Sequence, residues 1–345
     1  MRRAEAYPGA LVPLGFTGAV RTVHRGIANI EHQGLFISLV TDPRDRTALS
    51  VLVPTLPPEH LAAFPVGTPA VATPEGLRLG EILSLRFPPG KRRFSGRLRV
   101  RPEQAAEIVS PAAWEALLWC LRDNPGYHRG FVPLVLTDES GRAVQSGRAV
   151  QSGRAVQSDR AVQSDRAVQS DPFVRRAAGV LRELTGSPAT TLDLSPLVGL
   201  GPGFTPAGDD FISGALLAEN LCREAEDAVA RASERTDDAD DGPRAGRAPR
   251  GRQLPRPRIQ REPIAAAFHR TTTGGATVLH LALERRPPLF VHRMCGTLTR
   301  SGDSMAVRCA AAVAVASRFG HSSGLDLLAG FLWYLGRFDR ARVRV

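Results

Sequence analysis

Two glycine-rich segments that carry aspartates are the part of this chain best suited to do chemistry. Residues 199–210 read Gly-Leu-Gly-Pro-Gly-Phe-Thr-Pro-Ala-Gly-Asp-Asp, and residues 320–326 read Gly-His-Ser-Ser-Gly-Leu-Asp. Both continue into the pattern Gly-x-Asp-x-x-x-Gly, over residues 208–214 and 324–330. Each motif predicts a glycine loop that enters a helix, with acidic side chains in the first helical turn. The repetition of one residue set favours a ligand site built from two helix N-termini.

A helix N-terminus is suited to bind a small anion. Its first backbone N–H groups have no partner inside the helix, and the helix dipole adds about half a positive charge there. Phosphates and carboxylates bind at such places, and nearby glycines let the ligand approach the backbone. We therefore expect a small anionic substrate, a phosphate, carboxylate or carbamoyl compound. The expected binding residues are Gly201, Gly203, Thr205, Gly208, Ser322, Ser323 and Gly324.

The three aspartates of the motifs, Asp209, Asp210 and Asp326, have two interpretations. They can simply cap and neutralise their own helices, and Ser323 and Asp326 do have capping-box spacing. Alternatively they act on a ligand. Asp210 lies four residues before a glycine, and so does Asp326, so each aspartate shares a helix face with a glycine. If the two helices cross closely at these glycines, the carboxylates meet. We predict that the aspartates are catalytic.

Further polar residues flank the motifs. His321 stands directly before the second loop and is a candidate general acid or base, or a donor to a phosphate oxygen. Residues 271–275, Thr-Thr-Thr-Gly-Gly, form a third polar loop before a predicted helix. The glycine loop is neither a Walker A motif nor a dinucleotide fingerprint, because it lacks their spacing. We expect no organic cofactor. A magnesium ion bound by Asp209, Asp210 and Asp326 stays possible, because carboxylates are hard oxygen ligands.

The elements that must position these residues suggest an α+β protein. Residues 1–101 contain short runs rich in Val, Ile and Leu, separated by Gly, Pro and Asp, and predict an antiparallel β-barrel or sandwich. The predicted strands are residues 17–29, 35–39, 49–53 and 77–87. Residues 102–345 predict a helical domain that carries both motifs. Ser110 and Pro111 have the character of an N-cap and a first helical residue.

Later helices are predicted at residues 265–270, 276–284, 305–318 and 325–336, and the last has an apolar face that implies burial. Two segments read as disordered inserts. Residues 141–171 repeat the hexapeptide Gly/Asp-Arg-Ala-Val-Gln-Ser, whose period fits neither helix nor heptad. Residues 223–262 place an acidic run before an arginine-rich, proline-rich run.

Composition limits the partners. The net charge is +11, but Lys91 is the only lysine, and this arginine bias has no nucleic-acid-binding motif beside it. We therefore expect no nucleic-acid partner. The four cysteines form no C-x-x-C pair and suit a reducing cytoplasm. No apolar run is long enough to cross a membrane, so we expect a cytoplasmic protein without a membrane partner.

Residues 199–210 and 320–326 resemble the AllH family, formerly a domain of unknown function and described as a subunit of oxamate carbamoyltransferase. The family's loop looks like Thr-Pro-Ser-Gly-Asp-Asp, and Ala207 stands here in the serine position. The resemblance implies carbamoyl transfer between oxalurate and phosphate in purine (allantoin) nitrogen catabolism, together with other protein subunits. The alternative hypothesis is a non-catalytic protein that binds a small anion or assists the assembly of a metabolic enzyme.

Overall fold

The N-terminal part of the chain forms one sheet of nine short strands. The computed structural model describes residues 2–136, 171–186, 190–237 and 256–343. Strands β1 and β2 lie at opposite ends of the sheet although only Ala6 separates them in the chain, so the sheet curls until it is nearly closed. The strands are β1 (Arg2–Glu5), β2 (Tyr7–Pro8), β3 (Thr17–His24), β4 (Ile27–His32), β5 (Leu35–Val40), β6 (Ser50–Leu52), β7 (Pro69–Thr73), β8 (Gly76–Leu79) and β9 (Leu83–Arg86).

Most neighbouring strands are antiparallel, as expected, but β1 pairs with β9 and β5 with β6 in parallel. The predicted strand at residues 17–29 is a hairpin, because Arg25 and Gly26 form a two-residue turn and Gly26 has a φ of +78°. Along β7 the side chains alternate between exposed and buried, which is the pattern of a strand with one face on a core. A short helix, α1 (Pro58–Ala62), packs against β3 and β4.

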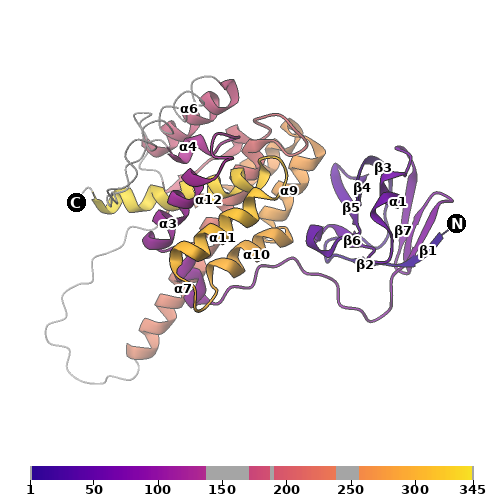
Figure 1. The fold of residues 1–345 in the computed structure, drawn as a ribbon, viewed down its shortest axis with the longest axis horizontal. Coiled ribbons are helices and arrows are strands. Elements are labelled where there is room, and N and C mark those ends of the chain that lie inside the picture. The colour runs from indigo at the N-terminus through magenta and orange to yellow at the C-terminus, as the bar shows by residue number, and fades with distance from the viewer. Residues whose placement is uncertain (1, 137–170, 187–189, 238–255, 344–345) are drawn as a thin grey trace.

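A helical domain follows, and Figure 1 shows it beside the sheet. Helix α12 contacts α3, α4, α7 and α11, and the apolar face predicted for it is buried from Leu325 to Leu335. The helices are α2 (Pro102–Ile108), α3 (Pro111–Asp123), α4 (Pro133–Leu136), α6 (Pro172–Gly186), α7 (Ala207–Asp237), α8 (Arg261–Ala266), α9 (Thr273–Leu283), α10 (Leu289–Leu298), α11 (Met305–Ser317) and α12 (Ser323–Val343). The α+β fold class is thereby confirmed.

Helix α3 begins as predicted, since the Ser110 hydroxyl accepts a hydrogen bond from the backbone N–H of Ala113 and Pro111 is the first helical residue. Helix α10 is not among the helices predicted from the sequence. Its apolar side chains are buried, among them Phe290, Val291 and Met294. The cysteines are free thiols, and three of the four are buried.

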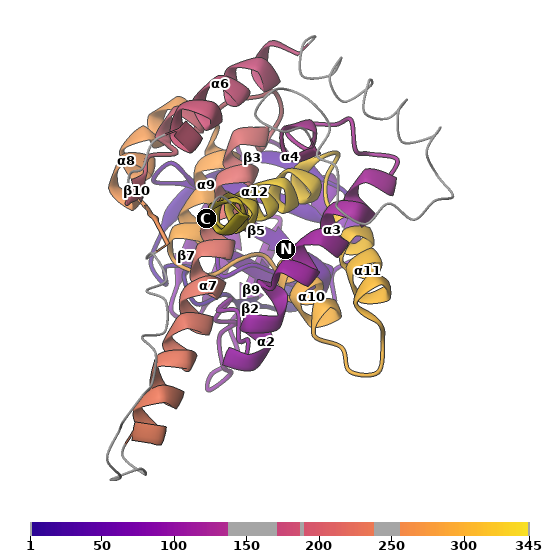
Figure 2. The same cartoon turned by 90° about the vertical axis from the view of Figure 1, so that its left-hand side faces the viewer.

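The charged segment at residues 223–262 differs from the prediction of disorder. Helix α7 continues through it to Asp237, and its far end projects beyond the other helices in Figure 2. Residues 238–255 lie outside the described residues, as do residues 141–170 of the hexapeptide repeat. After the gap, β11 (Arg258–Ile259) pairs in parallel with β10 (Thr191–Leu192).

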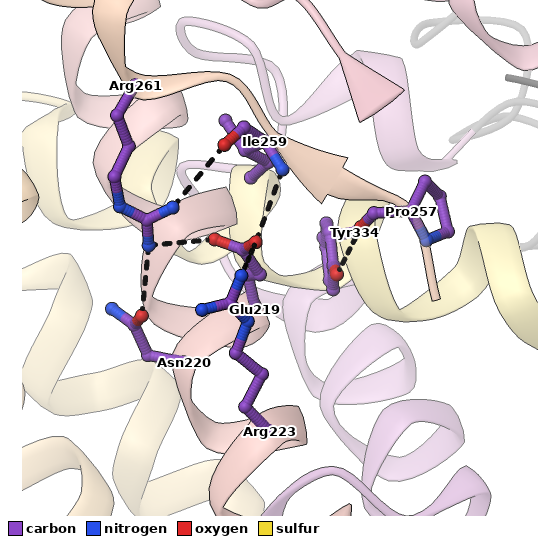
Figure 3. A network of polar contacts seen from close by, with 7 residues as sticks. All are labelled: Glu219, Asn220, Arg223, Pro257, Ile259, Arg261 and Tyr334. Atoms are coloured by element: carbon purple, nitrogen blue, oxygen red, sulfur yellow. Dashed lines mark hydrogen bonds and ion pairs between the residues drawn. The ribbon is translucent and has the colours of Figure 1, made fainter. Parts of the chain in front are cut away.

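The returning chain is fixed to α7 by the buried carboxylate of Glu219 (Figure 3). This carboxylate accepts hydrogen bonds from the guanidinium groups of Arg223 (3.2 Å) and Arg261 (2.9 Å) and from the backbone N–H of Ile259 (3.2 Å). Two cations and a backbone donor compensate the burial of one charge. The network holds the middle of α7 in place, three turns after the motif aspartates.

Sheet and helical domain touch next to the first motif. The backbone N–H of Phe36 on β5 donates to the Thr277 hydroxyl on α9 over 2.8 Å. The Phe36 ring stacks on Phe204 with the ring centroids 5.3 Å apart. The loop of the first motif therefore lies at the junction of the two domains, a common position for ligand sites.

Candidate functional site

The two motifs meet at Thr205 and Ser323. Their hydroxyl oxygens are 2.9 Å apart, although 118 positions separate the residues in the chain. Thr205 lies just before α7, and Ser323 is the first residue of α12. The expectation that the two helix N-termini lie side by side is confirmed.

Glycines bring the two helices this close. A β-carbon on Gly214 of α7 would overlap the backbone carbonyl of Leu327 on α12, and one on Gly330 of α12 would overlap the carbonyl of Phe211 on α7. The crossing therefore needs a hydrogen atom as the side chain on both helices. These are the two glycines that share a face with the motif aspartates, so the predicted geometry of the crossing is confirmed.

The crossing places Asp210 and Asp326 together in the interior. Asp210 is 3% exposed and Asp326 is 0% exposed. The hydroxyl groups of Ser323 and Thr205 lie beside the Asp210 carboxyl. The Oδ1 atom of Asp326 accepts a hydrogen bond from the backbone N–H of Phe131 over 2.6 Å. The Oδ2 atom of each aspartate is buried without a hydrogen-bond partner among the described residues.

Burial controls the protonation of this pair. Desolvation raises the pKa of Asp210 well above its ordinary value, and the charge of Asp326 raises it further. Desolvation raises the pKa of Asp326 to about 7, against the lowering effect of hydrogen bonds from Phe131 and Ser322. Near neutral pH the pair therefore holds at least one proton, and a protonated carboxyl group can donate a hydrogen bond to a ligand.

Asp209 is turned away from the pair. Its Oδ1 atom accepts a hydrogen bond from the backbone N–H of Gly199 over 2.8 Å, and its Oδ2 atom accepts one from the Thr271 hydroxyl. Burial raises the pKa of Asp209 to about 6, and these two hydrogen bonds oppose the rise. Asp209 thus connects α7 to the beginning of its own motif and to the threonine loop.

The threonine loop brings a third helix N-terminus to the first motif. Thr272 is the N-cap of α9, and its hydroxyl oxygen accepts a hydrogen bond from the backbone N–H of Gly275 over 2.9 Å. The same hydroxyl donates to the backbone carbonyl of Phe204 over 2.5 Å. The N-termini of α7, α9 and α12 therefore converge on residues 201–205, where their dipoles favour negative charge.

The predicted binding glycines separate into two groups. Gly201 and Gly203 have φ values of +112° and +108°, which side chains other than glycine rarely adopt, and they shape the loop before α7. Gly208 and Gly324 are buried in packed backbone. Their N–H groups already donate hydrogen bonds to the carbonyls of Leu200 and Phe319, so a ligand has to find its donors at other residues.

Of the other predicted residues, Ser322 lies beside the pair, and its hydroxyl favours the ionised form of Asp326. His321 lies at the exposed rim, and its imidazole has no hydrogen-bond partner among the residues that the structure describes. Its backbone carbonyl accepts a 3.4 Å hydrogen bond from Arg129.

Gly130 and Phe131 are site residues that the sequence did not indicate. Gly130 has a φ of +53°, and a β-carbon there would overlap the Asp326 carboxyl. Only glycine lets this loop turn its next N–H group onto Asp326. A single glycine in a loop, distant from both motifs in the chain, carries no signal of this contact.

The carboxylates do not form a three-ligand metal centre in this arrangement. Both oxygens of Asp209 have protein donors, whereas Asp210 lies close enough to Asp326 for the charge of Asp326 to raise its pKa. Among the described residues no group of three or more His, Cys, Asp or Glu side chains is gathered as a metal ion would require. The groups that the site offers to a ligand are therefore hydroxyls, helix N-termini and buried carboxyls.

A family model matches the part of the chain that carries both motifs. Residues 197–335, which contain both motifs and α7, α9 and α12, match the family model of oxamate carbamoyltransferase subunit AllH. The resemblance to the AllH family is thereby confirmed over these residues. No curated protein and no solved structure matches the chain. Within the described segments, no helix has the combination of length and apolar character that crossing a membrane requires.

Proposed function

We propose that the protein is the carbamoyl-transferring subunit of an oxamate carbamoyltransferase-like enzyme and binds its substrate where α7 and α12 begin. The reaction is carbamoyl transfer between oxalurate and phosphate, in purine (allantoin) nitrogen catabolism. The AllH family match supports the reaction class. The single observation that carries the site is the buried pair of Asp210 and Asp326 beside the linked hydroxyls of Thr205 and Ser323.

The substrates suit this position. Oxalurate, oxamate, phosphate and carbamoyl phosphate are small anions, and converging helix N-termini favour negative charge. The hydroxyls of Thr205 and Ser323 and the backbone N–H groups near Gly203 bind phosphate or carboxylate oxygens. Ser322 and Gly324 shape the entry to α12.

The carboxyl pair acts on the carbamoyl group. A phosphate oxygen forms a bond to the carbamoyl carbon, and the bond from this carbon to the oxamate nitrogen breaks. The proton lost by phosphate ends on that nitrogen, so oxamate leaves with an intact amide. The carboxylate of the pair accepts a hydrogen bond from the carbamoyl N–H₂, and the protonated carboxyl donates to the carbonyl oxygen, on which negative charge develops.

Two further residues have roles in this proposal. His321 stands at the rim and protonates the leaving nitrogen or binds phosphate. Asp209 positions the loop at Gly199 and the Thr271 hydroxyl. If magnesium takes part, Asp210 and Asp326 supply its protein ligands, because each has one oxygen without a partner, whereas both oxygens of Asp209 are engaged.

A thermal-shift titration tests this function. Phosphate, oxamate, carbamoyl phosphate and Mg²⁺ are added separately to the wild-type chain and to Asp210→Asn. A ligand at a hundred times its Kd stabilises the folded protein by about 2.7 kcal/mol. We expect stabilisation of the wild type by the anions, and a smaller stabilisation by carbamoyl phosphate in Asp210→Asn, whose changed side chain lies at the carbamoyl group. If no anion stabilises the wild type, the proposed function is wrong.

A second function has one observation in its favour. Ala207 occupies the position where the family's loop carries a serine, so one hydroxyl is missing near the site. The chain would then bind a small anion without catalysis, or assist the assembly of a partner enzyme. Binding of oxamate without formation of carbamoyl phosphate, when partner subunits are present, would favour this alternative. Neighbouring genes for acyl-CoA-synthetase-like subunits and allantoin enzymes would favour the catalytic function.

A further inference from the structure

A cavity of about 60 Å³ extends from Asp210 along one face of α7. Asp210, Ser213 and Leu217 line it at helical spacings of three and four residues, and Leu98, α9, α10, Phe319 and Leu327 of α12 supply the other walls. The cavity leads away from Thr205 and Ser323, which lie before Asp210 in the direction of the helix. Asp210 therefore stands between the proposed anion site and the cavity.

Beyond Asp210 and Ser213, Asn220 is the other uncharged polar side chain in the walls of this cavity, and most of the remaining lining is apolar. The apolar lining residues include Leu217, Val278, Ala282, Phe290 and Leu327. Two further charged residues line the cavity, Glu224 and Arg285. They lie at the end away from Asp210, and Glu224 is fourteen residues after Asp210 on α7. A ligand group inside the cavity therefore moves from water to an apolar surface. No cationic side chain among the described residues lines the cavity at the end where Asp210 lies. This environment favours an uncharged aliphatic group and opposes a second anion.

We propose that this cavity is a subsite for the aliphatic part of a carbamoyl ligand whose polar head is bound at Asp210. The inference rests on the proposed function because it takes the carbamoyl head from it. The volume holds about four to five water-sized groups, which corresponds to a chain of about four carbon atoms. The preferred ligand is then a short-chain alkyl carbamoyl compound, and the unpartnered oxygen of Asp210 accepts from its N–H₂ group.

The test is a chain-length series. Uncharged n-alkylureas, from methylurea to hexylurea, are titrated into the full-length chain by isothermal titration calorimetry. Each methylene group that enters the cavity should raise the affinity about fourfold, up to about butylurea, and longer chains should gain nothing more. An affinity that does not change with chain length overturns the proposal.

Two substitutions of lining residues should move the preferred length in opposite directions. Ala282→Phe fills the cavity from α9 and should shift the optimum to shorter ureas. Leu217→Ala enlarges it from α7 and should shift the optimum to longer ureas. Ala265→Phe on the exposed face of α8 is the matched control and should leave the optimum unchanged. If Ala282→Phe does not fold, Leu217→Ala decides alone. An optimum that stays at one length in every folded cavity variant overturns the proposal.

Phosphate binding separates this inference from the proposed function. Phosphate has no aliphatic part, so its affinity should be the same in Leu217→Ala, Ala282→Phe and the wild type. Wild-type binding of alkylureas without binding of phosphate would contradict the anion site and leave the subsite standing. Phosphate binding without any alkylurea binding would contradict the subsite alone.

Discussion

Gly214 on α7 and Gly330 on α12 hold the two helices at backbone contact, each lying against a carbonyl of the other helix. Because this contact is made one turn after Asp210 and Asp326, it fixes the distance between the two carboxyls. The packing of the two helices and the placing of the two carboxyls therefore both depend on Gly214 and Gly330.

Gly330→Ala should destabilise the protein strongly. The added methyl group meets a backbone carbonyl, which cannot rotate away as a side chain does, so we expect a loss of about 3 kcal/mol or more in the free energy of unfolding. Urea denaturation followed by circular dichroism measures it. Gly296→Ala is the matched control, because Gly296 lies on the exposed face of α10 and a β-carbon there meets no atom within 4 Å. It should stabilise by about 0.5–1 kcal/mol. Equal effects of both substitutions would show that the crossing is looser than described.

Asp326→Asn should change the pH dependence of stability. The folded pKa of Asp326 is about 7, above its ordinary value of 3.8. The folded state therefore holds the proton more tightly, and stability from this group is present below about pH 4 and lost as the pH rises to about 7. Asparagine still accepts from Phe131 but does not ionise. Between pH 4 and pH 8 the free energy of unfolding of the variant should therefore rise relative to that of the wild type by a few kcal/mol.

Denaturation curves at several pH values check this prediction. Asp171→Asn, at the start of α6, is a suitable control because its carboxyl is only half-buried and caps a helix. Parallel curves for the wild type and Asp326→Asn across this pH range would mean that Asp326 is ionised throughout in the folded protein.

Asp209→Asn and Asp210→Asn should have different effects although the residues are adjacent. An asparagine at position 209 keeps an oxygen for the Gly199 N–H and offers its N–H₂ to the Thr271 hydroxyl, so ligand binding should persist. An asparagine at position 210 removes a proton-binding group beside the ligand and should lower affinity for oxamate at least tenfold. Titration calorimetry on both variants tells the roles apart. Equal losses of oxamate affinity in the two variants would show that Asp209 contacts the ligand as well.

Thr205→Val and Ser323→Ala should be coupled energetically. Each removes one hydroxyl of the contact between the motifs, and a double-mutant cycle should give a coupling of about 1 kcal/mol in unfolding free energy. Thr297→Val is the control partner, because its hydroxyl bonds to the Met294 carbonyl within α10. Its effect should add to that of Ser323→Ala within about 0.5 kcal/mol. If the unfolding free energies are additive in both cycles, the contact between the Thr205 and Ser323 hydroxyls is contradicted.

The sequence predicted the parts of this site that depend on local spacing. An aspartate four residues before a glycine fixes both on one helix face, and this was enough to predict the crossing of α7 and α12. The same reasoning predicted the buried face of α12 and the cap at Ser110, because both follow from helical periodicity and from the chemistry of the first turn.

Contacts that depend on the path of distant loops were not predictable. The Phe131 N–H reaches Asp326 only because Gly130 turns the chain, and Asp209 turns to Thr271 only because α9 begins beside it. At residues 223–237 charge was interpreted as disorder, yet Ala, Glu and Arg are also good helix formers. The burial of Ala225 and the ion-pair network at Glu219 stabilise the helical conformation of this segment.

Titration calorimetry of oxamate and carbamoyl phosphate with Ser323→Ala, beside the wild type, tests whether the N-termini of α7 and α12 form one ligand site. Ser323 is the first residue of α12. Its hydroxyl contacts that of Thr205 and lies beside Asp210, so it belongs to the site shared by the two helices. We expect one saturable site in the wild type and at least tenfold weaker binding in the folded variant. Unchanged affinity in Ser323→Ala, or no binding to the wild type, would contradict the shared site.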